Sequence, residues 1–240
     1  MKILITNDDG VNASQLIPLI NACRRFAEVT VVVPKQEQSA KSHSIEIRNA
    51  FEIRQVELAP DITVWTVDST PADCVRFAVS GLNLHFDLVI SGINRGYNLG
   101  RDTMYSGTLA AATEAVNKGM NGLALSSSMK YYDRAVEHLS EILQYLDRNK
   151  MFENHSLYNV NIPVNPHGIR ITRLGGESFL EEFVPVGNNL YFPGGKPFHE
   201  NSTDMTLDTV ATNNGCISIT PITADRTQWE TFYTLQNLNP

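Results

Sequence analysis

Short apolar runs alternate with helical segments through the first half of this 240-residue chain. The runs at 2–6, 29–33 and 86–90 are almost entirely apolar, as expected of parallel strands that are buried on both faces. Helical patterns at 14–26 and 70–82 lie between these runs. Repeated strand–helix–strand units of this size predict an α/β fold in which helices cover both faces of a mostly parallel sheet.

Local signals predict the ends of several further elements. Ser14 is expected to cap the first helix, and Thr70 followed by Pro71 to open the second. The alternation of apolar and polar residues over 44–58 predicts a hairpin with one wet face. Short strands are expected at 63–67 and 123–126.

The second half of the chain has a different pattern. It contains an amphipathic helical segment at 133–149 and a short helix expected to open at 203–204. Strand-like pieces are expected at 157–162, 168–174, 179–186 and 216–220. We expect one domain over 1–240, in which 1–128 forms the core with the site and 129–240 forms a β-rich extension used for assembly.

Polar loops follow three of the predicted strands. The first is Asn7-Asp8-Asp9-Gly10, directly after the run at 2–6. These residue types also make ordinary turns, and that simpler interpretation stays open. However, ligands bind parallel sheets at the carboxyl ends of the strands, and two adjacent carboxylates need a compensating cation or proton. Their hard oxygen atoms suit Mg²⁺, Mn²⁺ or Ca²⁺.

The second loop, at 35–44, carries Ser39, Lys41 and His43 among its polar residues. Such a loop is ordinarily no more than a solvated connection. Only its position after a predicted strand makes it a candidate.

The third loop, at 91–108, is rich in Gly and Asn and leads into a helix that is capped by Ser106. The free N–H groups and the positive end of the dipole at such a helix start bind anions. The alternative is a capped helix after a purely structural loop. A metal on Asp8 and Asp9 that faces a phosphate at Ser106 would form a phosphatase site, because the metal neutralises phosphoryl oxygens and acidifies a bound water.

Composition and missing motifs exclude other classes. The formal charge of −7 argues against a nucleic-acid polymer as partner. The histidines lack zinc-site spacing, and no nicotinamide-binding glycine motif follows the first strand, which disfavours a Rossmann oxidoreductase. The three separated cysteines read as reduced core residues. With no leader pattern and no membrane-length apolar run, we expect a cytoplasmic protein.

Four segments of the chain resemble the SurE family of stationary-phase survival proteins, which are 5′/3′-nucleotidases. They are KILITNDDG at 2–10, STPADCV at 69–75, SGINRGYNLGRDTMYSGT at 91–108 and CISITPI at 216–222. The resemblance implies a Rossmann-like three-layer α/β/α sandwich. It also implies a homodimer or homotetramer, and hydrolysis of nucleoside 5′- and 3′-monophosphates, or of short polyphosphate, with Mg²⁺ or Mn²⁺.

The resemblance also assigns site residues. The implied ligands of one divalent metal per subunit are Asp8, Asp9, Ser39 and Asn94. The implied phosphate and substrate surroundings are Asn98, Ser106, Gly107 and Thr108. The chain departs from the usual family pattern at Gln15, at Ala40, where glycine is common, and at Ala110, where a second glycine is common.

The resulting hypothesis is a metal-dependent phosphomonoesterase in which Asp8 or Asp9 takes the proton of the attacking water. The alternative is a non-catalytic sensor of nucleotides or phosphate on the same fold. We expect no membrane partner.

Overall fold

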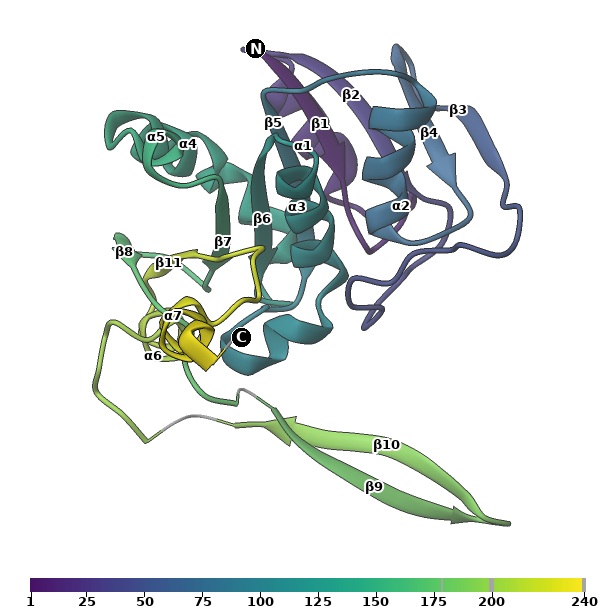
Figure 1. Cartoon of the computed structure of the whole chain (residues 1–240). Coiled ribbons are helices and arrows are strands. Elements are labelled where there is room, and N and C mark those ends of the chain that lie inside the picture. Colours follow the sequence, from purple (N-terminus) through teal and green to yellow (C-terminus); the bar gives the residue numbers. More distant parts are fainter. Residues whose placement is uncertain (178, 199–200, 239–240) are drawn as a thin grey trace.

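The computed structural model describes residues 1–177, 179–198 and 201–238, and its centre is a nine-stranded sheet (Figure 1). The strand order across the sheet is β3-β4-β2-β1-β5-β6-β7-β11-β8. The strands are β1 (Lys2–Thr6), β2 (Glu28–Pro34), β3 (Ile53–Ala59), β4 (Ile62–Val67), β5 (Leu88–Arg95), β6 (Asn121–Ser127), β7 (Leu157–Ile162), β8 (Ile169–Ile171) and β11 (Ile217–Pro221).

The first strand lies inside the sheet, between β2 and β5, and pairs with both in parallel. Parallel pairing continues from β4 to β2 and from β5 through β6 to β7. Antiparallel pairs occur where β3 meets β4 and where β11 meets β7. Because the chain proceeds to opposite sides of β1, the sheet has its topological switch point there, and such points open a crevice beyond the carboxyl ends of the strands.

Helices cover both faces of this sheet. The α-helices are α1 (Leu16–Cys23), α2 (Pro71–Arg76), α3 (Gly107–Asn117), α4 (Leu139–Arg148), α5 (Met151–Asn154), α6 (Asp208–Asn213) and α7 (Trp229–Leu235). A π-helical turn, Phe77–Gly81, continues α2. Single 3₁₀ segments precede α3 (Gly100–Tyr105) and α4 (Tyr132–His138), and another, Gln236–Leu238, follows α7.

The side chains of β1 show how the two faces divide. Ile3 and Ile5 belong to one buried apolar cluster, which the residues of α1 and α4 complete. Leu4 points to the opposite cluster, which includes residues of α2 and α3. A strand buried on both faces therefore separates two helical layers, and the predicted three-layer α/β/α sandwich with a mostly parallel sheet is confirmed.

The start of α1 differs from the expectation. Gln15, not Ser14, occupies the position before the helix and makes no side-chain capping bond. The Ser14 hydroxyl instead donates to Asp133 over 3.2 Å. The helix also ends at Cys23 rather than near Phe26. A tertiary partner therefore replaces the local cap.

The hairpin predicted for 44–58 is wrong in its first half. No strand forms over 44–52, and the antiparallel pair consists of β3 and β4. The reason is that carboxylates accept the backbone N–H groups that a ladder would have used. The N–H of Glu46 donates to Asp73 over 2.8 Å, and the N–H groups of Arg48 and Asn49 donate to the side chain of Glu46.

Strand β5 runs further than the predicted end at Ile90. It continues to Arg95 through a register shift between Ser91 and Asn94. Gly92 lies at this shift with a φ of +139°, and a Cβ there would collide with the backbone oxygen of Leu125 in β6. Because Gly92 has no side chain, β5 and β6 can approach each other closely at this point. In the sequence, the same glycine indicates a turn rather than a continued strand.

The second half continues the same sheet through β7, β11 and β8. The single helix predicted for 133–149 is instead a 3₁₀ segment followed by α4. The helix expected at 203–204 was also placed wrongly, because α6 begins at Asp208. Asp204 accepts the N–H of Thr206 in a local turn instead.

A two-stranded ribbon, here called the arm, consists of β9 (Phe179–Gly187) and β10 (Leu190–Pro197). Figure 1 shows it extending away from the rest of the molecule. Most of its apolar side chains are exposed, among them Phe183, Val186, Leu190, Tyr191 and Phe192. Among the helices that the structure describes, none combines the length and the apolar character that crossing a membrane requires.

Candidate functional site

The loops that follow β1 and β2 are joined by their backbones. The N–H of Gln38 donates to the carbonyl of Asp8 over 2.7 Å, and the N–H of Val11 donates to Pro34 over 2.9 Å. Gly10 has a φ of +84°, and a Cβ at this position would press on the backbone of Gln36. This close approach brings the Ser39 loop beside the two carboxylates.

The Asp8 carboxylate lies under the first turn of α3 and is only 4% exposed. Its Oδ1 atom accepts the hydroxyl proton of Thr108 over 2.6 Å. Burial raises the pKa of Asp8 to about 6, and the neighbouring charge of Asp9 adds to the shift, while the Thr108 bond opposes it. The site therefore holds a carboxylate whose negative charge is poorly compensated.

The Asp9 carboxylate points to the other side, towards β5 and the 3₁₀ segment before α4. Its Oδ2 atom accepts the backbone N–H of Arg95 at 3.0 Å and the hydroxyl of Tyr132 at 3.3 Å. Burial raises the pKa of Asp9, these two donors lower it, and the charge of Glu37 raises it. Burial also raises the pKa of Tyr132, so its hydroxyl remains a donor.

A hollow of about 740 Å³ opens beside Asp9. Ser39 and Glu37 line it from the loop after β2, and Arg95 and Tyr132 line it from the opposite side. The Ser39 hydroxyl donates to Glu37 over 2.6 Å. The structure thus brings Asp9 and Ser39 to the same hollow.

Asn94 lies within β5, opposite Ser126 of β6. Its amide nitrogen donates to the carbonyl of Gly96 over 2.9 Å. This bond fixes which end of the amide acts as donor, so the side-chain oxygen is the atom suited to a cation. The immediately following residue, Arg95, contacts Asp9, which places Asn94 next to the same edge of the site.

The start of α3 closes the site above Asp8. The Ser106 hydroxyl accepts the N–H of Leu109 over 3.0 Å, which confirms the predicted cap. A Cβ on Gly107 would lie 3.0 Å from the Cβ of Asp8 and 3.2 Å from its Oδ2. Gly107 and Thr108 are therefore in direct contact with the first carboxylate.

Asn98 is placed differently from the other candidates. Its side-chain amide donates to Ser126 over 2.8 Å in the interior, and its backbone carbonyl accepts the amides of Asn159 and Asn161. These contacts bind the Gly- and Asn-rich loop to β6 and β7. The geometry gives Asn98 a clear part in holding the loop.

The donor set fits a hard divalent cation. Asp8, Asp9, Ser39 and Asn94 offer only oxygen atoms for such an ion, which suits Mg²⁺ or Mn²⁺ rather than zinc. The raised pKa values of both carboxylates indicate a negative charge that the protein alone does not neutralise. Within 1–177, 179–198 and 201–238, no group of three or more His, Cys, Asp or Glu side chains forms a metal cluster, so serine and asparagine would have to complete this set.

Several contacts around the site gave no signal in the sequence. Tyr132 lies 123 residues from Asp9 and contacts it only because the chain folds back. The pair of His43 and Glu114, 3.0 Å apart, pins the Ser39 loop to α3. Burial acts to raise the pKa of Glu114, but the bond to His43 and nearby positive charges hold it below its usual value.

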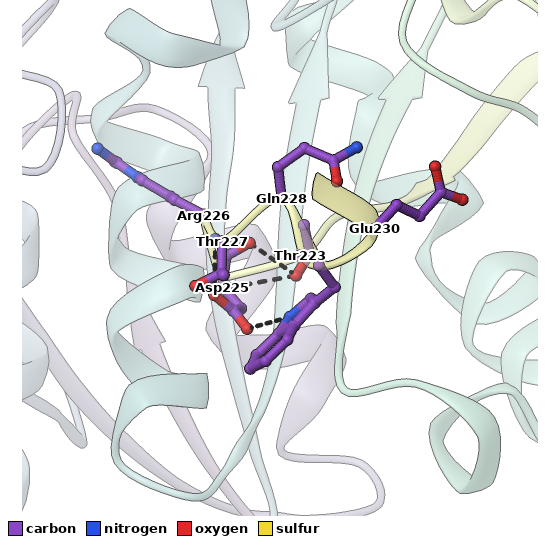
Figure 2. Close-up of a pocket in the computed structure, with 7 residues that line it drawn as sticks. Thr223, Asp225, Arg226, Thr227, Gln228 and Glu230 are labelled. Carbon is purple, nitrogen blue, oxygen red and sulfur yellow. Dashed lines mark hydrogen bonds between the residues drawn. The ribbon is translucent and has the colours of Figure 1, made fainter. Parts of the chain in front are cut away.

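A separate hollow of about 560 Å³ lies at 223–230, before α7 (Figure 2). Its polar groups largely satisfy one another. Asp225 accepts the N–H of Thr227 over 2.8 Å and the indole N–H of Trp229 over 2.7 Å. Because one short segment forms this hollow and it contacts none of the strand-end loops, we do not assign the chemistry to it.

Comparisons with known proteins agree on one family. The family model described as "Survival protein SurE" matches residues 3–181. The chain is 36% identical to "5'-nucleotidase SurE" of Legionella pneumophila strain Philadelphia 1, over 99% of this chain and 97% of that one. It is 38% identical to "5'-nucleotidase SurE" of Desulforudis audaxviator, over 96% and 94% of the two chains. The crystal structure of the protein "Sure" from Aquifex aeolicus superposes with a TM-score of 0.80 at 28% identity, covering both chains completely.

Proposed function

This chain belongs to the SurE family, and from that membership we propose that it is a metal-dependent nucleotidase that hydrolyses nucleoside 5′-monophosphates. The observation that carries the proposal is the position of Asp8, a buried carboxylate directly beneath the start of α3. Such a helix start favours a phosphate, and the carboxylate pair favours a cation. The proposed activity extends to 3′-monophosphates and short polyphosphate.

In this proposal Asp8, Asp9, Ser39 and Asn94 hold one Mg²⁺ or Mn²⁺. When bound, such an ion neutralises phosphoryl oxygens and makes water more acidic. Thr108 orients Asp8, and the Arg95 N–H and the Tyr132 hydroxyl orient Asp9. A water then attacks phosphorus, and one of the two carboxylates takes its proton. The ester P–O bond breaks, and the nucleoside oxygen that leaves recovers a proton to become a hydroxyl, while inorganic phosphate stays behind.

The phosphate binds at the first turn of α3. Ser106 caps the helix by accepting the N–H of Leu109, and the positive end of the helix dipole at this turn attracts the anion. Gly107 lets Asp8 lie close to this turn because it has no side chain. Asn98 contributes by holding the loop before the helix. This arrangement concentrates positive potential where negative charge increases in the transition state.

Measuring phosphate release from 5′-AMP, 5′-GMP, 3′-AMP and tripolyphosphate, with Mg²⁺, Mn²⁺ or a chelator, tests the proposal. We expect activity that depends on the metal and an Asp8→Asn variant that loses roughly 100-fold or more, the scale of a lost catalytic group. Asp61→Asn is the control, because Asp61 lies in the turn before β4, at the amino end of that strand and away from the strand ends that carry the site. Its φ of +63° is one that asparagine also tolerates.

Two results would contradict the proposal. One is a wild-type protein that binds nucleoside monophosphate yet releases no phosphate with any metal, which would favour the sensor. The other is an Asp8→Asn variant with full activity that a chelator does not affect.

We further propose that the arm joins copies of this chain into a homodimer or homotetramer. An isolated two-stranded ribbon is marginally stable in water, and contiguous exposed apolar side chains mark an interface. Phe183 and Phe192 are 64% and 62% exposed on this ribbon. The register places the two side chains on opposite faces of the ribbon, so the proposed assembly covers both faces.

The three thiols favour a reducing compartment, and we propose the cytoplasm. Cys23, Cys74 and Cys216 are all buried and free of disulfides. Burial raises the pKa of Cys23 to about 12, so this thiol stays protonated and unreactive.

A further inference from the structure

The loop between β5 and α3 is held by residues from the second half of the chain. Asn161 of β7 forms two hydrogen bonds with the backbone of Asn98: its Oδ1 accepts the N–H, and its Nδ2 donates to the carbonyl, both over 2.9 Å. One side chain thus takes up both backbone polar groups of a loop residue 63 positions away. The backbone N–H and the carbonyl of this loop residue are therefore both held in place.

Asp208, at the start of α6, holds the same loop two residues further on. Its carboxylate is fully buried. Oδ2 accepts the N–H of Gly100 over 3.0 Å, and Oδ1 accepts the N–H groups of Gly175 over 2.7 Å and Thr209 over 2.8 Å. A buried carboxylate is costly unless donors surround it, so these backbone N–H groups and the carboxylate depend on one another.

Gly100 also lies directly against the segment that leads into the arm. The N–H of Arg101 donates to the carbonyl of Gly176 over 3.0 Å. A Cβ on Gly100 would collide with that same carbonyl oxygen. The residues 175–177 therefore form a root of the arm that packs backbone to backbone on the loop.

Gly100 is connected to the start of α3 by one short helical segment. The 3₁₀ segment Gly100–Tyr105 runs directly into Ser106, which caps the helix. On the other side the loop continues from Asn94 and Arg95 of β5. A shift of about 1 Å at a site of this kind costs on the order of 100-fold in rate.

We propose that Asp208 is a positioning residue, which sets the place of the active-site loop by tying Gly100 to the root of the arm at Gly175. This inference rests on the proposed nucleotidase function. Asp208 touches no reacting atom. It acts through the loop, which Asn161 also holds by its two hydrogen bonds to Asn98.

The experiment compares Asp208→Asn with Thr212→Val in the full-length chain. Asparagine keeps the shape of the side chain but has one acceptor oxygen where aspartate has two. Its NH₂ group would then face a backbone N–H, and two donors cannot form a hydrogen bond. Thr212 lies on the same helix and donates to Ser218 over 3.0 Å in the interior, away from the loop. The control therefore loses a buried hydrogen bond on α6 without disturbing Gly100 or Gly175.

Three quantities are measured in both variants: the unfolding temperature, kcat and KM for 5′-AMP, and backbone hydrogen exchange of peptides that cover 96–106. We expect similar losses of unfolding temperature, but a fall of about 10- to 100-fold in kcat/KM only in Asp208→Asn, the range set by misplacement of a catalytic site. We also expect faster exchange over 96–106 only in that variant.

A second pair of variants separates loop position from folding yield. Gly100→Ala introduces a Cβ into the contact with Gly176 at a φ of +52°, whereas Gly119→Ala introduces one at a φ of +78° with no atom within 4 Å. Both alanines carry a similar backbone cost. We expect Gly100→Ala to reproduce the kinetic loss of Asp208→Asn and Gly119→Ala to keep wild-type kcat/KM.

The outcomes separate the inference from the function on which it rests. A wild-type chain that hydrolyses no phosphate ester overturns the proposed function, and the exchange data then decide whether Asp208 fixes the loop. An active wild type with equal kcat/KM and equal exchange in Asp208→Asn and Thr212→Val overturns the positioning role alone.

Discussion

The hydroxyl of Thr108 donates to Oδ1 of Asp8 over 2.6 Å, which joins the first turn of α3 to the loop after β1. The two residues are 100 positions apart in the chain. The bond brings the proposed phosphate side of the site and the proposed metal side into contact. It also lowers the pKa of Asp8 against the larger effect of burial.

Removing this hydroxyl is expected to weaken catalysis without unfolding the protein. Thr108→Val keeps the shape but loses a hydrogen bond to a charged group, worth about 1.5–3 kcal/mol, or roughly 10- to 100-fold. Thr108→Ser retains the hydroxyl and is the control. Steady-state phosphate release with a titration of Mg²⁺ measures the effect, and equal kcat/KM in the valine and serine variants would refute this role of the bond.

The metal-free protein is expected to lose stability as the pH rises. Asp8 has a pKa near 6 when folded and an ordinary value of 3.8 otherwise, so the folded state binds more protons between these values. The contribution of this carboxyl to the free energy of unfolding is therefore greatest below pH ~4, declines as the pH rises to ~6, and stays low above that. A shift of this size corresponds to at most about 3 kcal/mol.

Urea unfolding of chelator-treated protein at several pH values measures this effect. Asp8→Asn is expected to be more stable than wild type above pH ~6, by an amount that shrinks towards pH ~4. Saturating Mg²⁺ should stabilise only the wild type. An asparagine variant that is less stable than the chelated wild type at neutral pH would contradict the prediction.

Gly107→Ala is expected to reduce activity by displacing Asp8. The added Cβ would lie 3.0 Å from the Cβ of Asp8, which is closer than ordinary contact, so the carboxylate must move by a few tenths of an ångström. The matched control is Ala110→Gly on the same helix, which costs about 1 kcal/mol in stability but leaves Asp8 untouched. We expect Gly107→Ala to lower kcat and to leave the unfolding temperature unchanged. We expect Ala110→Gly to lower the unfolding temperature and to leave kcat unchanged.

Ala40→Gly is expected to relax the loop that carries Ser39. Ala40 has a φ of +56°, in the left-handed region that costs a non-glycine residue about 1 kcal/mol. The gain is partly offset by the greater freedom of glycine in the unfolded chain, which leaves a net change of up to about 1 kcal/mol. Calorimetry should show a higher unfolding temperature for Ala40→Gly. Ala27 does not have a positive φ, so Ala27→Gly should lower the unfolding temperature. A decrease in both variants would show that the loop is not strained at Ala40.

Charged residues on the arm are expected to dissociate the assembly. Phe183→Glu and Phe192→Glu each place a carboxylate on one face of the arm, where the assembly would bury it and an unpaired charge is costly. Phe26→Glu is the control, since Phe26 is 47% exposed in the turn between α1 and β2, in the body of the molecule. Light scattering should give a smaller mass for the arm variants alone, and a wild-type monomer would refute the proposed assembly.

Local patterns were enough to predict the central strands and two of the three expected helix caps. Continuous apolar runs marked β1 and β2, and the capping residues Thr70 and Ser106 were recognisable because a cap is a contact between near neighbours. The strand-end rule then predicted that Asp8, Asp9 and the loop at 35–44 lie together, and the family resemblance singled out Ser39 within that loop.

Contacts between distant residues account for what the sequence did not reveal. The strand expected after Ser44 does not form because Asp73, on α2, takes the N–H of Glu46. The donors that orient Asp9, and the side chains of Asn161 and Asp208 that hold the loop, lie in segments whose own patterns are those of ordinary strand and helix. The periodicity of a sequence cannot predict that a side chain will bond to a backbone group 60 or more residues away.

The place of β1 in the sheet has a consequence for synthesis on the ribosome. Strand β1 is translated before both of its neighbours, β2 and β5, so one of its edges stays uncovered until residues 88–95 have been made. Asp208, which fastens the loop after β5, emerges more than a hundred residues later still. Nascent chains grow from the N-terminus at about 5–20 residues per second. The residues proposed for chemistry are thus translated well before Asp208, the side chain that fastens their loop.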